Sequence, residues 1–253
     1  MIFKPKPLLG QQINWTHPLA RGLVGCWLMD EKGGLTVRDY SKYQNHLTID
    51  SLATWYWSIY GLSINSASYD LVSSPTKGFN PQAMTIFQQV IPIGVDTETG
   101  YTFRHRVGST DTRIYIGTIN YDVHFRVGDA DPRTVVVGFS LNDLLNLSLT
   151  LNKGTANFRC NNVRDSVGYT NFTNIDPLCH FGGLSNDLRS TIVLTYIWDR
   201  VLTDGCISQL QINPYVFFGD LLPINLMAYV ATAGGGLSIP IAAHHYKQLM
   251  GVN

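Results

Sequence analysis

The chain has 253 residues, 14% of them charged, and its acidic and basic side chains cancel to a formal net charge of zero. An average soluble domain carries about 25% charged residues, so we expect a surface of neutral polar and aromatic groups. Zero net charge argues against electrostatic nucleic-acid binding, which needs a basic surplus. No run reaches the ~20 apolar residues of a membrane span, and no apolar signal core follows Met1. We therefore expect neither membrane insertion nor export.

The four cysteines are far apart in the sequence and form no CxxC pair. Two disulfides are one alternative, and four buried thiols are the other. We favour buried thiols, and we expect the protein to be made in a reducing cytosol. The cysteines are Cys26, Cys160, Cys179 and Cys206.

Residues 1–18 are expected to form an N-terminal arm. The stretch Lys4-Pro5-Lys6-Pro7 favours the extended polyproline conformation, and it cannot join a central strand. Two interpretations remain open: a frayed terminus, or a strap that binds a neighbouring subunit. In the second interpretation Lys4, Pro5 and Pro7 are assembly residues.

The first predicted strand covers residues 22–29, and a turn follows at residues 30–34. A cluster of aromatic residues comes next. Exposed aromatic rings stack on the faces of sugars, but clustered rings also fill cores and interfaces, and both alternatives stay open. The members of this cluster, which are our candidates for glycan binding, are Trp55, Tyr56, Trp57 and Tyr60.

Short strands separated by polar turns are predicted through most of the remaining chain. The last of them, residues 191–198, is rich in β-branched and aromatic residues, and its near-continuous apolar run predicts burial on both faces. The other predicted strands cover residues 61–65, 69–72, 83–93, 101–107, 113–119, 121–127, 134–139, 147–151, 156–161 and 163–165.

A short helix is predicted after the last strand. Thr203 can cap it by accepting a backbone N–H, and Asp204 suits the positive end of the helix dipole. Ile207 and Leu210 lie on one helical face, and Pro214 bounds the helix. An isolated helix of this length is marginal in water, so we expect it to pack on a sheet.

Residues 219–253 are expected to form a C-terminal docking tail. A triglycine joint at residues 234–236 precedes a short amphipathic segment, and burying its apolar groups on another subunit is favoured over leaving them hydrated. His244 and His245 are adjacent and would point about 100° apart on a helix, which argues against a metal pair. The expected assembly is a homo-oligomer, with a trimer preferred. Its tail residues are Ile239, Ile241, Tyr246 and Leu249.

Two landmarks at opposite ends of the chain resemble one family. The stretch GLVGCWLMDEKGG at residues 22–34, followed by Asn45-His46, resembles the family's opening GLVAYWPFDEGSGTTVYDSSGNGNHG. The stretch WDRVLTDGCISQL at residues 198–210 resembles its closing NRALS-x-x-E-I-x-x-L-Y, with Cys206 in place of the usual glutamate. These are the signatures of LamG-like, concanavalin A-like jelly rolls.

The resemblance implies an all-β fold. We expect an antiparallel two-sheet jelly-roll sandwich over residues 19–218, with one short helix after the last core strand. The N-terminal arm (1–18) and the C-terminal tail (219–253) are the expected extensions.

Hydrolases of this fold carry clustered acidic residues on one strand, where paired carboxylates cleave the glycosidic bond. This chain has only two glutamates, Glu31 and Glu98, both in predicted turns, and no predicted strand carries two carboxylates on one face. We therefore expect no enzymatic activity.

Calcium is the one candidate metal, because related domains often hold it at the positions of four acidic residues of this chain. These residues are Asp30, Glu31, Asp39 and Asp70. Aspartates in turns commonly bind only their own backbone. We favour that structural role and expect no cofactor, with calcium as the alternative.

LamG-like domains with such arms are similar to bacteriophage virion proteins that decorate capsids or form fibres and tail appendages. The resemblance therefore implies a non-enzymatic virion structural protein, made in the host cytoplasm and bound to capsid or tail proteins. The alternative is a carbohydrate-binding module that recognises cell-surface glycans. A glycoside hydrolase is a distant third.

Overall fold

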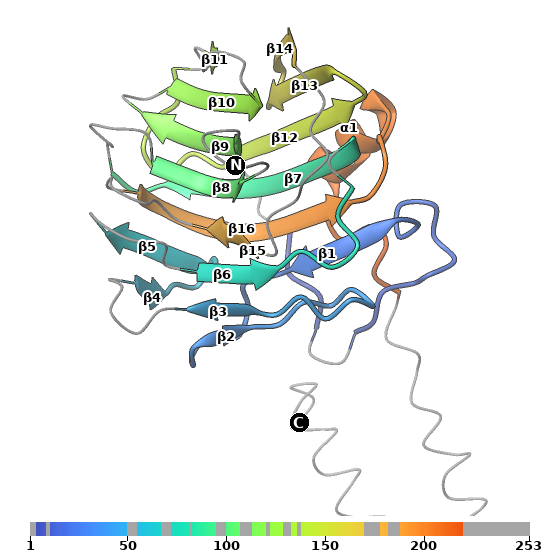
Figure 1. Ribbon diagram of the computed structural model, residues 1–253. Coiled ribbons are helices and arrows are strands. Elements are labelled where there is room, and N and C mark those ends of the chain that lie inside the picture. The colour runs from blue at the N-terminus through green and yellow to red at the C-terminus, as the bar shows by residue number, and fades with distance from the viewer. Residues whose placement is uncertain are drawn as a thin grey trace, which may run out of the picture. The chain divides into compact units, whose positions relative to one another are not determined.

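The computed structural model describes residues 4–8, 11–49, 55–66, 72–80, 82–94, 100–106, 113–119, 122–128, 133–135, 138–169, 178–181 and 188–219. The expected docking tail beyond Gly219, with all its assembly residues, lies outside this part, as do Asp70 and Glu98. Within the described residues the chain is mostly strand, with a single helix, and every strand pair is antiparallel (Figure 1). The predicted all-β class is confirmed.

The described strands form two eight-stranded sheets. The first sheet has the order β14-β13-β12-β7-β16-β5-β4, and β1 also pairs with β16. Its strands are β1 (Leu23–Trp27), β4 (Trp55–Trp57), β5 (Leu62–Ser66), β7 (Ala83–Pro92), β12 (Leu145–Asn152), β13 (Thr155–Cys160), β14 (Val163–Gly168) and β16 (Leu188–Trp198).

The second sheet has the order β11-β10-β9-β8-β15-β6-β3-β2. Its strands are β2 (Thr36–Val37), β3 (Leu47–Ile49), β6 (Val72–Pro75), β8 (Gly100–Arg106), β9 (Arg113–Ile119), β10 (Asp122–Gly128), β11 (Arg133–Val135) and β15 (Leu178–Phe181).

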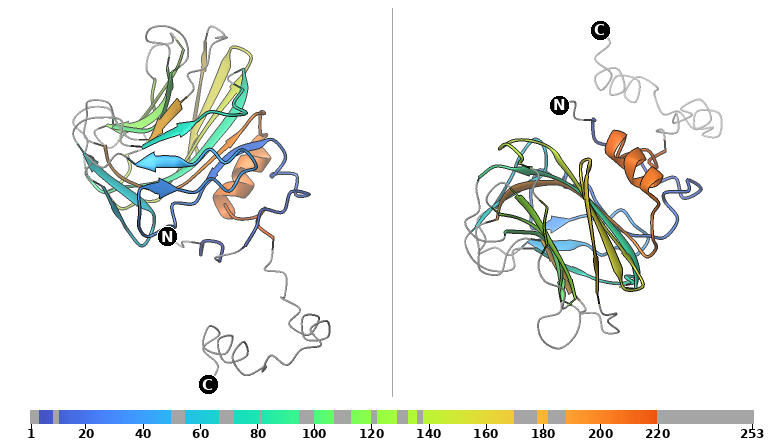
Figure 2. Two further views of the ribbon diagram at one scale, coloured as in Figure 1. Left: turned by 60° about the horizontal axis from the view of Figure 1, so that its bottom comes forward. Right: turned by 90° about the horizontal axis from the view of Figure 1, so that it is seen from above.

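The main hydrophobic core lies between the two sheets, which face each other (Figure 2). Aromatic contacts cross this interface. Phe125 of β10 stacks on Phe158 of β13 with ring centroids 4.6 Å apart, and Trp27 of β1 meets Phe181 of β15 edge-on at 5.4 Å. Burying one large apolar side chain stabilises the fold by about 1.5–3 kcal/mol, so this interface is the principal source of stability.

Strand β16 is the centre of the first sheet. It pairs with β7 along one edge, and with β5 and then β1 along the other. All side chains from Thr191 to Trp198 are buried, which confirms the predicted burial on both faces. The pairing of β1 with β16 also brings the two family-like landmarks together.

A second apolar layer covers the outer face of the first sheet. Helix α1 (Asp204–Ile212) begins at the N-cap Thr203, whose hydroxyl accepts the Cys206 N–H as predicted. Ile207 and Leu210 of the helix are buried there. They belong to one cluster with the outward-facing rings of β7 and β16 and with segments from both chain ends, whose members include Leu19, Phe87, Tyr196, Trp198 and Phe217.

The N-terminal segment packs against other parts of the same chain. Ile13 is buried and forms an antiparallel bridge with Phe218, and Gln11 donates a hydrogen bond to the Gly219 carbonyl at 2.6 Å. The ammonium of Lys6 donates to the carbonyl oxygens of Leu28 and Met29 at 2.6 and 2.9 Å. The segment is therefore an integral part of the domain, and its expected role as a strap between subunits stays a prediction.

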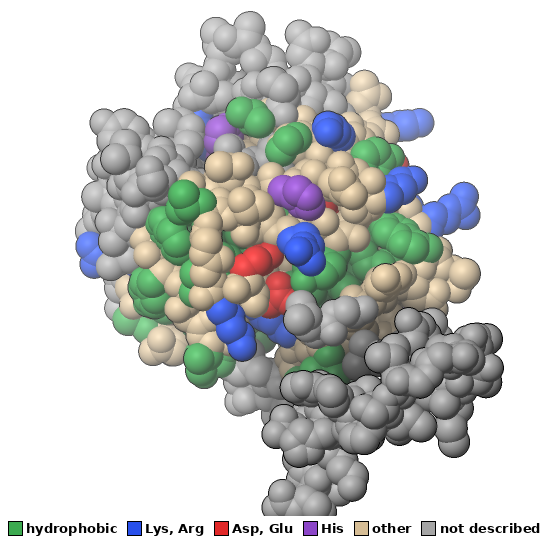
Figure 3. All heavy atoms as spheres, turned by 90° about the horizontal axis from the view of Figure 1, so that it is seen from below, with side chains coloured by type: hydrophobic (Ala, Val, Ile, Leu, Met, Phe, Trp, Pro, Cys, Tyr) green, Lys and Arg blue, Asp and Glu red, His purple; other side chains and the backbone are tan. Residues whose placement is uncertain are grey.

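All four cysteines are free thiols, which agrees with the favoured alternative, although Cys206 is only partly buried. Within the described residues no helix is long and apolar enough to cross a membrane. On the face shown in Figure 3, charged side chains of both signs are scattered among neutral polar groups.

Candidate functional site

The aromatic hollow is the first of two candidate sites on the outer face of the first sheet. It has a volume of about 350 Å³. Its residues come from β4, β5, β7, β16 and neighbouring turns, and they are Tyr56, Ser58, Ile59, Tyr60, Ser63, Ile91, Ile93, Asn142 and Thr191.

The structure divides the four predicted glycan-binding aromatics into two pairs. Successive side chains of a strand point to opposite faces, so Trp55 and Trp57 share one face of β4 and Tyr56 takes the other. The two tryptophans meet edge-on at 6.2 Å and pack against the main core. Tyr56 is 49% exposed and Tyr60 41% exposed, and both line the aromatic hollow. The tyrosines are therefore the more exposed pair, and the tryptophans are partly buried.

The polar groups of the aromatic hollow are largely engaged with one another. The hydroxyls of Ser63 and Thr191 share a 2.6 Å hydrogen bond across β5 and β16. Ser58 accepts the backbone N–H groups of Tyr60 and Gly61 and so shapes the turn that presents Ile59 and Tyr60. The hollow therefore combines exposed rings with a hydrogen-bonded turn, which suits stacking on a flat ligand surface.

The N-terminal segment adjoins this hollow. A neighbouring depression of about 300 Å³ shares Ile59 and Tyr60 and is also lined by Lys4, Pro5 and Lys6. Burial lowers the pKa of Lys6 to about 8, against the opposing charges of Asp30 and Glu31. The assembly candidates Lys4 and Pro5 thus lie beside the aromatic candidates, and Pro7 lies in the same segment.

The polar groove is the second candidate site, with a volume of about 520 Å³, and the sequence reasoning missed it. Its floor and walls come from the outer face of β12, β13 and β14 and from the start of α1. The lining residues are Ser148, Thr150, Asn157, Phe158, Arg159, Arg164, Asp165, Ser166, Val201, Leu202, Asp204 and Ile207.

Strand register arranges the polar side chains of the groove in two rows. Ser148, Arg159 and Arg164 are register partners across β12, β13 and β14. The second row continues from Thr150 through Asn157 to Ser166. The intervening positions on β12 and β13, such as Leu149 and Phe158, belong to the main core.

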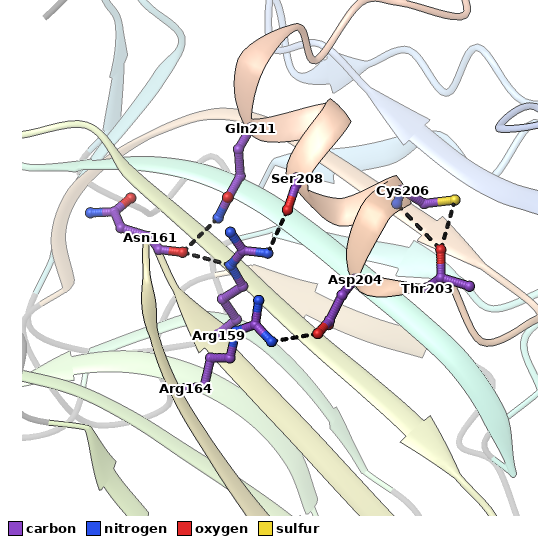
Figure 4. Close-up of polar contacts among 8 residues, drawn as sticks. All are labelled: Arg159, Asn161, Arg164, Thr203, Asp204, Cys206, Ser208 and Gln211. Atoms are coloured by element: carbon purple, nitrogen blue, oxygen red, sulfur yellow. Dashed lines mark hydrogen bonds and ion pairs between the residues drawn. The ribbon is translucent and has the colours of Figure 1, made fainter.

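Two arginines connect the polar groove to helix α1 (Figure 4). Arg159 donates to the Asn161 carbonyl at 2.7 Å and to the Ser208 hydroxyl at 3.0 Å. Arg164 forms an ion pair with Asp204 at 2.5 Å. Desolvation, together with the neighbouring charge of Arg164, lowers the pKa of Arg159. An anion beside these guanidinium groups would offset that repulsion.

Asp39, a weak calcium candidate, is a buried structural centre. Its carboxylate accepts the backbone N–H groups of Cys26, Ser41 and Asn45 at 2.7–2.8 Å, and also the Ser41 hydroxyl at 2.7 Å. This is the backbone role that the sequence favoured for turn aspartates. Desolvation raises the pKa of Asp39, and these hydrogen bonds oppose the shift.

Asp30 and Glu31 are also engaged. The Tyr40 hydroxyl donates to both oxygens of Asp30 at 3.4 Å, and Glu31 accepts the backbone N–H of Arg38 at 2.6 Å. Burial raises the pKa of Glu31. Among the described residues no group of three or more histidine, cysteine, aspartate or glutamate side chains is arranged to hold a metal ion. The fourth calcium candidate, Asp70, lies outside those residues.

No family model matches the sequence, and no curated protein matches it. The fold, by contrast, is similar to parts of larger solved structures. Trypanosoma rangeli sialidase in complex with sialic acid has a TM-score of 0.63 at 15% identity, covering 79% of this chain and 34% of the sialidase. The covalent intermediate of the same sialidase with 2,3-difluorosialic acid has a TM-score of 0.66 at 17% identity, with the same coverage.

A second group of similar structures comes from neurotoxins. Botulinum neurotoxin type C, whose cell entry depends on interaction with two ganglioside molecules, has a TM-score of 0.58 at 13% identity. The binding domain of botulinum neurotoxin DC in complex with SialylT has the same TM-score at 15% identity. In both cases 75% of this chain and 50% of the toxin chain are covered. The chain thus spans about a third of the sialidases and half of the toxin chains, and at these low identities the TM-scores show a likeness of fold alone.

Proposed function

We propose that the chain is a non-enzymatic structural module of the concanavalin A-like jelly-roll kind, attached to a virion through its two chain ends. One observation carries this proposal: the two end segments are paired with each other. The Asn14 N–H donates to the Phe217 carbonyl at 2.8 Å, and the Gly219 N–H donates to the Gln12 carbonyl at 3.0 Å. The chain therefore enters and leaves the sandwich at one place.

Such an arrangement suits attachment. Ile13 and Phe217 of these segments belong to one apolar layer over the outer face of the first sheet, so the described parts of both segments lie on the same side of the sandwich. The apolar pattern of the tail, centred on Ile241 and Leu249, favours burial on a partner. Non-enzymatic action is supported by the engagement of Asp30 and Asp39 with their own chain.

Truncation tests this function. Removing residues 233–253 should leave a folded, soluble sandwich that no longer forms an oligomer, as measured by circular dichroism and light scattering. Ile241→Asp and Leu249→Asp should weaken assembly, whereas the matched control Ala243→Asp adds the same charge on the opposite side of the predicted helix and should not. Assembly of the truncated protein at full strength would contradict attachment through the tail.

Carbohydrate binding at the aromatic hollow is a second candidate function, possible alongside the first. The observation that favours it is the exposure of Tyr56 and of Tyr60, which lies in the turn that Ser58 shapes. The similar structures include proteins in complex with sialic acid and a toxin whose entry depends on gangliosides. Stacking on an aromatic ring contributes about 1 kcal/mol.

Glycan-array binding tests this second function. Tyr56→Ala and Tyr60→Ala should each weaken binding about fivefold, the equivalent of one lost stacking contact. Trp15→Ala is the matched control, because Trp15 is 48% exposed and lines a different surface region. Equal losses for all three variants would argue against a ligand in the aromatic hollow.

A further inference from the structure

The floor of the polar groove consists of two hydroxyl groups that lack protein partners. Ser148 is only 2% exposed and Thr150 only 5% exposed, and both line the groove from β12. Among the described residues, neither side chain forms a hydrogen bond to a protein group. Neither hydroxyl oxygen is fully buried, so both open onto the groove, where a solvent molecule or a ligand can bind them.

The walls of the groove add donors. Arg159 is 8% exposed, and its contacts with Asn161 and Ser208 leave further guanidinium N–H groups for a ligand. The amide of Asn157 lies between Thr150 and Ser166 in the second row. A ligand in the groove would therefore meet hydroxyl, amide and guanidinium groups together.

The charge of the groove is positive on this face of the sheet. Arg159 and Arg164 are cross-strand partners, and like charges in that position repel each other. Asp204 balances one of them through its ion pair with Arg164. Asp165 is in register with the core residue Phe158, so its strand position faces the other side of the sheet. The carboxylate of a ligand would balance the remaining positive charge, that of Arg159.

We propose that the polar groove binds an acidic saccharide unit. Its carboxylate lies beside Arg159 and Arg164, where charge-assisted hydrogen bonds are strongest. Its ring hydroxyls meet the floor hydroxyls of Ser148 and Thr150. This inference rests on the proposed carbohydrate binding for its class of ligand, and it adds a second site of different chemistry from the aromatic hollow.

A saccharide fits better than an acidic peptide. A peptide carboxylate would engage the arginines, but a peptide offers few groups that both donate to and accept from the hydroxyls of Ser148 and Thr150. A sugar ring carries several such groups on one face. The groove thus matches a ligand that is anionic at one end and polyhydroxylated along its length.

The experiment is an NMR titration of the full chain with two probes that differ only at C6: methyl β-glucuronide, which carries a carboxylate there, and methyl β-glucoside, which carries a hydroxymethyl group. The glucuronide should bind about tenfold more tightly, because its carboxylate gains charged hydrogen bonds. A blocked diglutamate peptide is the third probe. Equal affinities for the two sugars, no detectable binding of the glucuronide, or tighter binding of the peptide would each overturn the proposal.

Two variants of the ion pair should act in opposite directions. Arg164→Gln should weaken glucuronide binding about fivefold or more, and Asp204→Asn should strengthen it about threefold by freeing Arg164. Both side chains are more than half exposed, so the fold should persist. Arg38→Gln, at an exposed position in the β2–β3 region, changes the net charge equally and should have no effect. Changes of the same sign for Arg164→Gln and Asp204→Asn would overturn the proposal.

The floor and the aromatic hollow provide the remaining controls. Ser148→Ala combined with Thr150→Val should weaken the binding of both sugars about threefold, since both probes carry the ring hydroxyls. Tyr56→Ala with Tyr60→Ala should leave glucuronide binding unchanged. If the tyrosine variants abolish it and the arginine variants do not, the ligand lies in the aromatic hollow, so carbohydrate binding stands and the groove assignment fails.

Discussion

Gln88 of β7 and Thr102 of β8 form a reciprocal pair of hydrogen bonds across the interior, between the two sheets. The Thr102 hydroxyl donates to Gln88 Oε1 at 2.8 Å, and Gln88 Nε2 donates to the Thr102 carbonyl at 3.2 Å. Gln88 Nε2 also donates to the Thr195 hydroxyl on β16 at 3.0 Å. Both members of the pair are fully buried. This polar link fixes the position of one sheet against the other within an otherwise apolar core.

Thr102→Val should lower the free energy of unfolding by about 1–3 kcal/mol, because it leaves Gln88 Oε1 without its donor in a buried site. The control is Thr48→Val, at an exposed position of β3, where a change within about 0.5 kcal/mol is expected. Urea unfolding measures both. In a double-mutant cycle with Gln88→Leu, strictly additive losses would show that the two side chains do not interact.

Thr203→Ala should cost about 1 kcal/mol of stability, since it removes the side chain that accepts the Cys206 N–H at the start of α1. Thr203→Ser retains the hydroxyl and should restore nearly all of the loss. Thermal unfolding followed by circular dichroism gives the comparison. If alanine and serine behave alike, the cap contributes nothing and the helix is held by Ile207 and Leu210 alone.

Gly61→Ala should lower the free energy of unfolding by about 2 kcal/mol or more, as expected for overpacking against a fixed backbone. A Cβ at this position would lie 2.1 Å from the carbonyl oxygen of Ile192 on the neighbouring strand β16. Gly33→Ala is the matched control, because nothing lies within 4 Å of a Cβ there. Urea unfolding of the two variants should therefore separate them clearly, and equal stabilities would contradict the close approach of β5 and β16.

The titration of Lys6 should make the free energy of unfolding change with pH in the alkaline range. Its pKa is lowered to about 8 in the folded chain, from 10.5. Between these values the unfolded chain binds more protons, so the free energy of unfolding rises with pH, by up to about 1 kcal/mol per pH unit. Below that window the buried charge opposes folding at a constant cost.

The measurement for Lys6 is the difference between the wild type and Lys6→Gln in urea unfolding at several pH values between about 8 and 10. Groups that titrate in both proteins cancel in the difference. A difference that stays flat across this range would show that the amine of Lys6 is not desolvated against Leu28 and Met29.

The sequence predicted those parts of the fold that local patterns determine. The strand at residues 191–198 was evident from its β-branched and aromatic run, and Arg113–Ile119 has the predicted bounds. The cap at Thr203 followed from residue type and spacing alone. Of the strand expected at residues 134–139, Thr134 and Val135 lie in β11, residues 136–137 lie outside the described residues, and Phe139 is buried outside any strand. The apolar character of Phe139 reflects core packing rather than strand formation.

The candidate sites were less accessible to sequence reasoning. The period-two alternation of a strand could have separated Tyr56 from Trp55 and Trp57, but only once Trp55–Trp57 was known to be a strand. The polar groove depends on the register of three strands and on the position of α1. Nothing in the separation of Ser148 and Arg164 along the sequence indicates that they lie in one row, because that row exists only after β12, β13 and β14 have paired.

The bridge between Ile13 and Phe218 has a mechanical consequence. Tension applied between the two ends of the chain would act first on this bridge and on the flanking hydrogen bonds at Asn14 and Gly219. The sheets behind it would carry no load until those few contacts had parted. Because Gln12 lies beside Gly219 in this antiparallel pairing, the bridge would open by unzipping, one hydrogen bond after another, and could re-form while the folded sandwich stays intact.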